Sequence, residues 1–60
     1  MKPRKVAPAE YDAARGPRVQ AVVYGKRRGG YVVDGWFYYV VGMDYLKLPV
    51  DRVDLIDGKG

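Results

Sequence analysis

The stretch YVVDGWFYYVV, residues 31–41, decides the fold of this chain. Its Asp-Gly step stands between two runs of β-branched and aromatic residues, which is the strongest short-range indication of a β-hairpin with a two-residue turn. Such a turn would set three pairs of residues opposite one another: Val33 and Trp36, Val32 and Phe37, and Tyr31 and Tyr38. The second run, residues 36–41, has no polar face. It is therefore either covered on both sides or presents one aromatic face to a partner.

The segment before this hairpin also has the pattern of a strand. Residues 18–24 alternate in the manner of a half-buried strand, and three small or β-branched residues share its inward face: Val19, Ala21 and Val23. The next six residues, GKRRGG at 25–30, leave two arrangements open. Either all six form a loop, or the strand continues to Arg28 and turns at Gly29-Gly30.

The segment after the hairpin predicts four short elements. They are a turn, a strand with its leucines inward, a single 3₁₀ turn and a last strand, at residues 42–44, 45–48, 49–52 and 53–56. The 3₁₀ turn is expected because proline fixes φ near its helical value and cannot donate a hydrogen bond to a neighbouring strand.

The first 17 residues form a basic arm rich in proline and alanine. Within it, residues 8–16 have the marks of a short helix, with proline and acids at the start, Arg15 near the end and glycine beyond it. So short a helix is not stable alone in water, so it must dock Tyr11 or its alanines on the body if it forms. The chain thus divides into an arm at 1–17, a β body at 18–57 and a frayed end at 58–60.

About five short strands in about forty residues are typical of a small closed barrel. The sequence therefore predicts an all-β protein, a five-stranded barrel with a flexible or short-helical N-terminal arm. VDGWF, residues 33–37, resembles the acidic-glycine-tryptophan step before the central strand of SH3 domains. PVDRVDLID, residues 49–57, resembles their closing proline, 3₁₀ turn and last strand. Over residues 18–57 the chain thus resembles the SH3-like barrel superfamily.

This resemblance implies different ligands for different members of the superfamily. If the chain were a peptide-binding SH3 domain, Trp36 and Pro49 would lie in its polyproline groove. However, Arg52 stands where that family usually has a groove tyrosine, and the loop that is usually acidic is here basic, at residues 26–28. Tudor-like and KOW-like barrels, and the C-terminal barrel of retroviral-type integrases, fit the charge better and imply binding of nucleic acid or modified proteins. The tetrameric plasmid-type dihydrofolate reductase is similar in size, but KLP at 47–49 replaces its glutamine-isoleucine-tyrosine core.

The composition removes most catalytic chemistry. The chain of 60 residues has no cysteine, histidine, serine, threonine or asparagine, and so lacks the usual nucleophiles and the commonest zinc ligands. We therefore expect no enzyme activity, no catalytic residues, no cofactor, no metal and no small-molecule substrate. No apolar run approaches the roughly 18 residues of a membrane span, and no secretory signal is present, so we expect a cytoplasmic protein without a membrane partner.

The charge is divided unevenly along the chain. The net charge is +4, yet residues 1–31 carry eight basic and two acidic side chains, whereas residues 32–60 carry three basic and five acidic ones. Such an oriented field steers a polyanion to one side. We predict a module that binds DNA or RNA, stacking bases on Trp36 and Tyr38. The phosphates would be contacted by seven basic residues: Lys2, Arg4, Lys5, Arg18, Lys26, Arg27 and Arg28.

Two alternatives accompany this prediction. The basic residues 26–28 are equally consistent with a solvated loop that keeps a small protein soluble. The aromatic side chains, Tyr31, Trp36, Tyr38 and Tyr45, fit a place in the core or in a subunit interface better than they fit a stacking platform. The alternative function is a protein-interaction or homodimeric assembly module that uses the aromatic strand 36–41.

Overall fold

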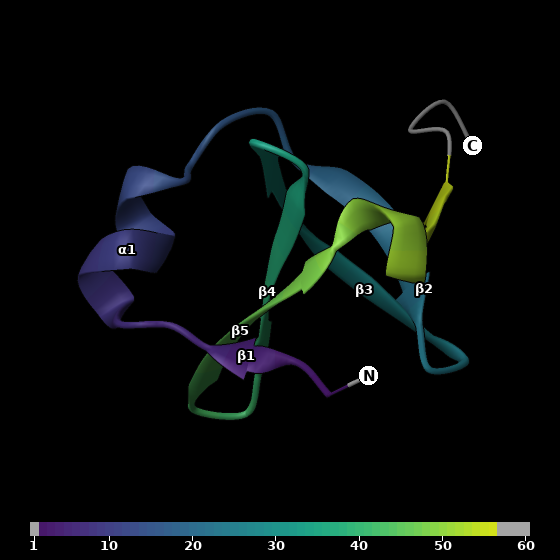
Figure 1. The fold of residues 1–60 in the computed structure, drawn as a ribbon, viewed down its shortest axis with the longest axis horizontal. Helices are drawn as coiled ribbons and strands as arrows, with labels where there is room; N and C mark the ends of the chain where they lie inside the picture. The colour runs from purple at the N-terminus through teal and green to yellow at the C-terminus, as the bar shows by residue number, and fades with distance from the viewer. Residues whose placement is uncertain (1, 57–60) are drawn as a thin grey trace.

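The structure is a computed structural model that describes residues 2–56, and more than half of these residues lie in strands. The elements, in chain order, are β1 (Arg4–Lys5), α1 (Pro8–Ala13), β2 (Val19–Val23), β3 (Lys26–Val33), β4 (Trp36–Val41), β5 (Asp44–Pro49), the 3₁₀ turn η1 (Val50–Arg52) and β6 (Asp54–Ile56). All strand pairs are antiparallel, and the strands form one sheet in the order β1-β5-β4-β3-β2-β6 (Figure 1). The predicted all-β class is confirmed.

The five strands predicted within residues 18–57 are present as β2 to β6, and the described chain has a sixth strand in the arm. Residues 2–56 contain six strands because Arg4 and Lys5 pair with Lys47 and Leu46 of β5. A two-residue strand has no periodic pattern that a sequence could display, so its pairing depends entirely on the neighbouring strand. The sheet is not closed by pairing between its end strands, because β1 and β6 lie at opposite ends of the strand order.

The hairpin between β3 and β4 has the predicted register. Val33 pairs with Trp36, Val32 with Phe37 and Tyr31 with Tyr38. The two turn residues, Asp34 and Gly35, have φ values of 52° and 80°. A two-residue turn of this kind requires positive φ at both positions, and aspartate followed by glycine adopts them readily.

Both arrangements predicted for residues 25–30 are wrong. The chain turns earlier, at Tyr24 and Gly25, and β3 then runs without interruption from Lys26. Gly29 and Gly30 therefore lie inside a strand. The first part of β3 pairs with β2 and the last part pairs with β4. Gly30 belongs to both parts, because it pairs with Val19 of β2 and with Tyr39 of β4. A Cβ added at Gly30 would lie 1.9 Å from the carbonyl oxygen of Tyr38, which shows how closely the two backbones approach.

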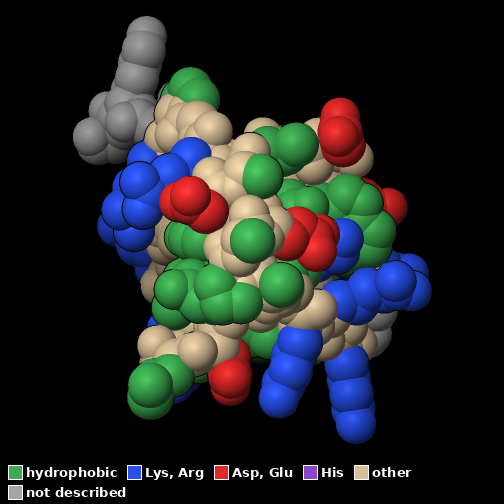
Figure 2. Space-filling model, turned by 90° about the vertical axis from the view of Figure 1, so that its left-hand side faces the viewer, with side chains coloured by type: hydrophobic (Ala, Val, Ile, Leu, Met, Phe, Trp, Pro, Cys, Tyr) green, Lys and Arg blue, Asp and Glu red, His purple; other side chains and the backbone are tan. Residues whose placement is uncertain are grey.

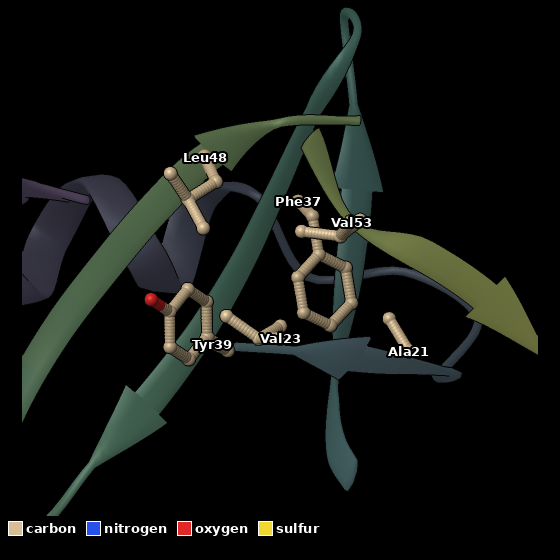
Figure 3. Close-up of a cluster of buried hydrophobic side chains, with 6 residues drawn as sticks. All are labelled: Ala21, Val23, Phe37, Tyr39, Leu48 and Val53. Atoms are coloured by element: carbon tan, nitrogen blue, oxygen red, sulfur yellow. The ribbon is translucent and has the colours of Figure 1, made fainter. Parts of the chain in front are cut away.

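The core lies on the concave side of the curved sheet. Its buried side chains come from β2, β4, β5 and the residue before β6, and they point toward one another in Figure 3: Ala21, Val23, Phe37, Tyr39, Leu48 and Val53. The predicted inward face of β2 is confirmed, because Ala21 and Val23 are buried and Val19 packs against the cluster. The predicted 3₁₀ turn is present at η1, and it returns the chain so that β6 pairs with β2.

The N-terminal arm lies against the sheet. The predicted helix forms over Pro8–Ala13, and it places Tyr11 against the rings of Tyr31 and Tyr45, at centroid distances of 5.6 and 4.8 Å. The backbone N–H of Val6 donates a hydrogen bond to the carbonyl of Tyr45 at 2.9 Å. No described helix has the length and hydropathy needed to cross a membrane. The predicted frayed end at 58–60, together with Asp57, lies outside the described residues.

Candidate nucleic-acid interface

The seven basic residues predicted to contact phosphates fall into two groups. Lys2, Arg4 and Lys5 lie on or beside β1, whereas Arg18, Lys26, Arg27 and Arg28 lie on or beside β2 and β3. β5 and β4 separate these strands in the sheet. On the α1 side of the molecule, Lys and Arg side chains gather at the left and lower right edges of the view, with hydrophobic and acidic side chains between them (Figure 2). The sheet thus does not join all seven residues in one patch.

The β2–β3 group divides again between the two faces of the hairpin. Lys26 and Arg28 stand opposite Val23 and Ala21, whereas Arg27 stands opposite Val22. Residues opposite one another share a face and neighbours along a strand alternate, so Arg27 projects away from Lys26 and Arg28. The basic residues 26–28 therefore lie on a paired strand and not in a loop, and their side chains project alternately to its two faces.

Arg18 completes the outer side of this hairpin. A Cβ added at Gly29 would lie 3.1 Å from the Nε atom of Arg18, so the Arg18 side chain extends over the backbone of β3. Gly29 stands opposite Gln20, and Arg27 stands opposite Val22, which is two residues further along β2. Arg18 and Arg27 therefore share the outer face, and each face of the hairpin has two cations.

In the part of the chain that the structure describes, none of these seven basic side chains forms an ion pair with a carboxylate. Within residues 2–56, ion pairs join Arg15 to Asp12 at 3.2 Å and Lys47 to Glu10 at 3.0 Å, and neither pair involves a predicted phosphate contact. Six of the seven side chains are exposed and Arg28 is half-buried. Their positive charge is thus available to a polyanion.

The predicted stacking residues lie under the chain's own cations. Lys47 Nζ lies 4.6 Å from the ring centroid of Trp36 and 5.7 Å from that of Tyr38, and the Cζ atom of Arg4 lies 5.9 Å from the Trp36 ring. Tyr38 is 7% exposed, and its hydroxyl donates a hydrogen bond to Glu10 Oε2 at 3.4 Å. Tyr38 is therefore not open to a base in this structure, and Trp36 is half-buried.

The arm covers much of the outer face of the aromatic strand. Glu10 binds both Lys47 and Tyr38, while Tyr11 lies between the rings of Tyr31 and Tyr45. The opposite face of β4 contributes Phe37 and Tyr39 to the core. Of the two interpretations of a strand without a polar face, coverage on both sides holds for its central residues. No short-range pattern could reveal this, because Glu10 and Lys47 are 37 residues apart.

Tyr24 was not among the predicted site residues. It occupies the first position of the β2–β3 turn with φ of 51°, and 66% of it is exposed. Burial raises the pKa of Tyr39, and Tyr24 raises it further while Arg28 lowers it. Tyr24 and Arg28 therefore both lie within electrostatic range of the Tyr39 hydroxyl. The one local signal was Gly25, since glycine is favoured at the second position of such a turn.

The described residues contain no pocket and no group of three or more histidine, cysteine, aspartate or glutamate side chains close enough to hold a metal. No protein-family model matches this chain, and neither a curated protein nor a solved structure matches it. The basic hairpin and the basic β1 are therefore the features from which a function can be argued.

Proposed function

We propose that this protein is a non-enzymatic module that binds nucleic acid, with the β2–β3 hairpin as its main contact and β1 as a second one. The observation that supports this function is the set of seven basic side chains without a described carboxylate partner. Each contact between such a side chain and a phosphate releases condensed counterions, which favours binding. The net charge of +4 adds a long-range attraction for any polyanion.

The fold proposed for this module is an SH3-like barrel formed by β2 to β6, to which β1 and α1 are additions. Three features support this assignment: the antiparallel meander from β2 to β5, the 3₁₀ turn after Pro49 and the return of β6 to pair with β2. Small barrels of this kind carry many unrelated functions. The fold is therefore compatible with nucleic-acid binding and does not by itself argue for it.

The alternative, an assembly or protein-interaction module that uses strand 36–41, has less support. The arm lies over the outer face of this strand through Glu10 and Tyr11, and the core occupies the inner face. A partner on the outer face would have to displace the arm. Sedimentation at high protein concentration tests this alternative, and a stable dimer that Trp36→Ala dissociates would favour it over nucleic-acid binding.

The decisive experiment measures how the affinity depends on salt. Labelled single-stranded and duplex oligonucleotides are titrated with the whole protein between about 50 and 200 mM salt, and the logarithm of the affinity should fall linearly with the logarithm of the salt concentration. The double variant Lys26→Gln/Arg27→Gln should make this slope shallower by about 1.4 to 1.8, because each lost phosphate contact removes about 0.7 to 0.9.

A matched control removes the same charge elsewhere. In Arg15→Gln/Arg52→Gln, one of the two changed residues already has an acidic partner, and the other lies on η1, outside both basic groups. In this variant, the slope of log affinity against log salt concentration should differ from the wild-type slope by no more than about 0.4, which corresponds to half a phosphate contact. Equal losses in the two variants would mean that only net charge matters. An absence of binding to every oligonucleotide at about 50 mM salt would refute the proposed function.

A further inference from the structure

The tip of the β2–β3 hairpin contains an unfavourable residue in a strained position. Tyr24 has a φ of 51°, in the left-handed region that glycine, asparagine and aspartate adopt far more readily than an aromatic residue does. The equivalent position of the β3–β4 turn has the preferred aspartate, Asp34, at φ 52°. The chain thus has a favourable residue in one such turn and an unfavourable one in the other. Backbone strain of this kind points to a role for the side chain.

The Tyr24 ring is also unusual in its exposure. It is 66% exposed, whereas every other aromatic side chain in residues 2–56 is buried or half-buried. Among the described residues, Tyr24 therefore presents the aromatic surface that is most accessible to a ligand.

Two cations follow Tyr24 within four residues of the chain. Lys26 and Arg28 follow Tyr24 on β3 and share one face, so their Cα atoms are about 6.6 Å apart at about 3.3 Å per residue. That spacing is comparable to the separation of successive phosphates in an extended single strand. Tyr24 raises the pKa of Tyr39 and Arg28 lowers it, so both residues lie within electrostatic range of the Tyr39 hydroxyl.

We propose that the hairpin tip binds single-stranded nucleic acid, with Tyr24 stacked on an unpaired base while Lys26 and Arg28 contact the adjoining phosphates. This inference rests on the proposed function and specifies its ligand. In a duplex the base faces are already stacked, and inserting a ring between them requires the duplex to unstack locally. Phosphates remain accessible in a duplex, so a duplex binds through the cations alone. Tyr24 thus adds affinity only where bases are free.

The test compares two substitutions of the same residue in the whole protein. Tyr24→Asn removes the ring and relieves the backbone strain, because asparagine tolerates positive φ. Tyr24→Phe keeps the ring and the strain. The probes are labelled single-stranded DNA and RNA of about twelve nucleotides, within the range of site sizes of small single-strand-binding barrels, and a DNA duplex of the same length.

Tyr24→Asn should weaken single-strand binding roughly fivefold to a hundredfold, which is the range expected for losing one stacked base. It should leave duplex binding within about twofold and should not lower the thermal midpoint. Tyr24→Phe should bind single strands nearly as well as the wild type does. The thermal midpoint of each variant is measured together with its binding, so that a loss of affinity caused by unfolding is recognised as such.

Each outcome separates this inference from the function on which it rests. If Tyr24→Asn binds single strands as tightly as the wild type, while both proteins keep salt-dependent binding, the stacking role is wrong and the proposed function stands. An equal loss for single strands and duplex likewise refutes the stacking role. If the wild type binds none of the probes, both proposals are wrong. A loss with RNA alone or DNA alone supports the role and identifies the type of strand.

Discussion

Two adjacent glycines in β3 should respond very differently to the same substitution. At Gly30, a Cβ would lie 1.9 Å from the Tyr38 carbonyl oxygen and 3.0 Å from Phe37 Cζ. At Gly29, it would lie 3.1 Å from Nε of Arg18, which belongs to a flexible and exposed side chain. Gly30→Ala therefore forces two backbones apart, whereas Gly29→Ala requires only that Arg18 move.

The magnitude follows from this geometry. To bring the Cβ beyond 3.0 Å from the oxygen, β3 and β4 must separate by more than about 1 Å at the pair Gly30–Tyr39. Overpacking alone costs about 1–3 kcal/mol. Disrupting one or two ladder hydrogen bonds adds about 1 kcal/mol each, so Gly30→Ala should lose about 3 kcal/mol or more. A chain of 60 residues has a total stability of about 3–9 kcal/mol, so the variant should lose about a third of its stability or more, and all of it at the low end of this range.

Urea unfolding followed by Trp36 fluorescence measures both variants against the wild type. Gly29→Ala should stay within about 0.5 kcal/mol of the wild type. Gly30→Ala should lower the thermal midpoint by roughly 4–8 °C for each kcal/mol lost, or show no folded baseline. If the two alanine variants unfold at the same urea concentration, the close approach at Gly30 does not govern the pairing of β3 with β4, and the reasoning is refuted.

Three further predictions concern the core and the arm. Phe37→Ala should destabilise by about 3–5 kcal/mol and leave little folded protein by circular dichroism, and a loss below about 1 kcal/mol would contradict its place in the core. Burial raises the pKa of Tyr39 above 10.0, so the folded chain holds this proton to higher pH than the unfolded chain does. The free energy of unfolding should therefore fall as pH rises above about 10, and it should fall less steeply in Tyr39→Phe than in the wild type. Urea midpoints at pH 8 and 10.5 measure both proteins, and an equal fall in the two would contradict this prediction. Glu10→Gln should lower the free energy of unfolding by about 0.5–1 kcal/mol, because the ion pair between Glu10 and Lys47 is partly exposed. Trypsin should cleave this variant after Arg15 faster than it cleaves Asp12→Asn, whose ion pair is more exposed. Equal cleavage rates would mean that Glu10 does not hold the arm against the sheet.

The elements that the sequence predicted well are those with local signals. Asp34-Gly35 specifies a turn with positive φ at both residues, and the inward face of β2 follows from alternation alone. The 3₁₀ turn follows from the restricted φ of Pro49. In each case the determining interaction lies within a few residues of the chain.

The first hairpin was mispredicted because its local signals conflict. Gly29-Gly30 has the composition of a turn, yet these glycines serve the close approach of two strands. Tyrosine is a residue type that is favoured in strands, yet Tyr24 occupies a turn position with positive φ. A glycine permits both a turn and a close backbone approach, and its sequence neighbours do not distinguish the two.

The amino-acid sequence alone determined the β class, the central hairpin, the sign and division of the charge, and the scarcity of catalytic side chains. Tertiary structure decided which basic residues share a face, since a one-residue change of register reverses every side chain in a strand. It also decided that the arm covers the aromatic strand, through contacts of Glu10 with residues 28 and 37 positions away. Such contacts depend on how the whole chain packs. The residue types alone therefore predicted Trp36 and Tyr38 as stacking residues, whereas Tyr24 was identified only from its exposure and its backbone conformation.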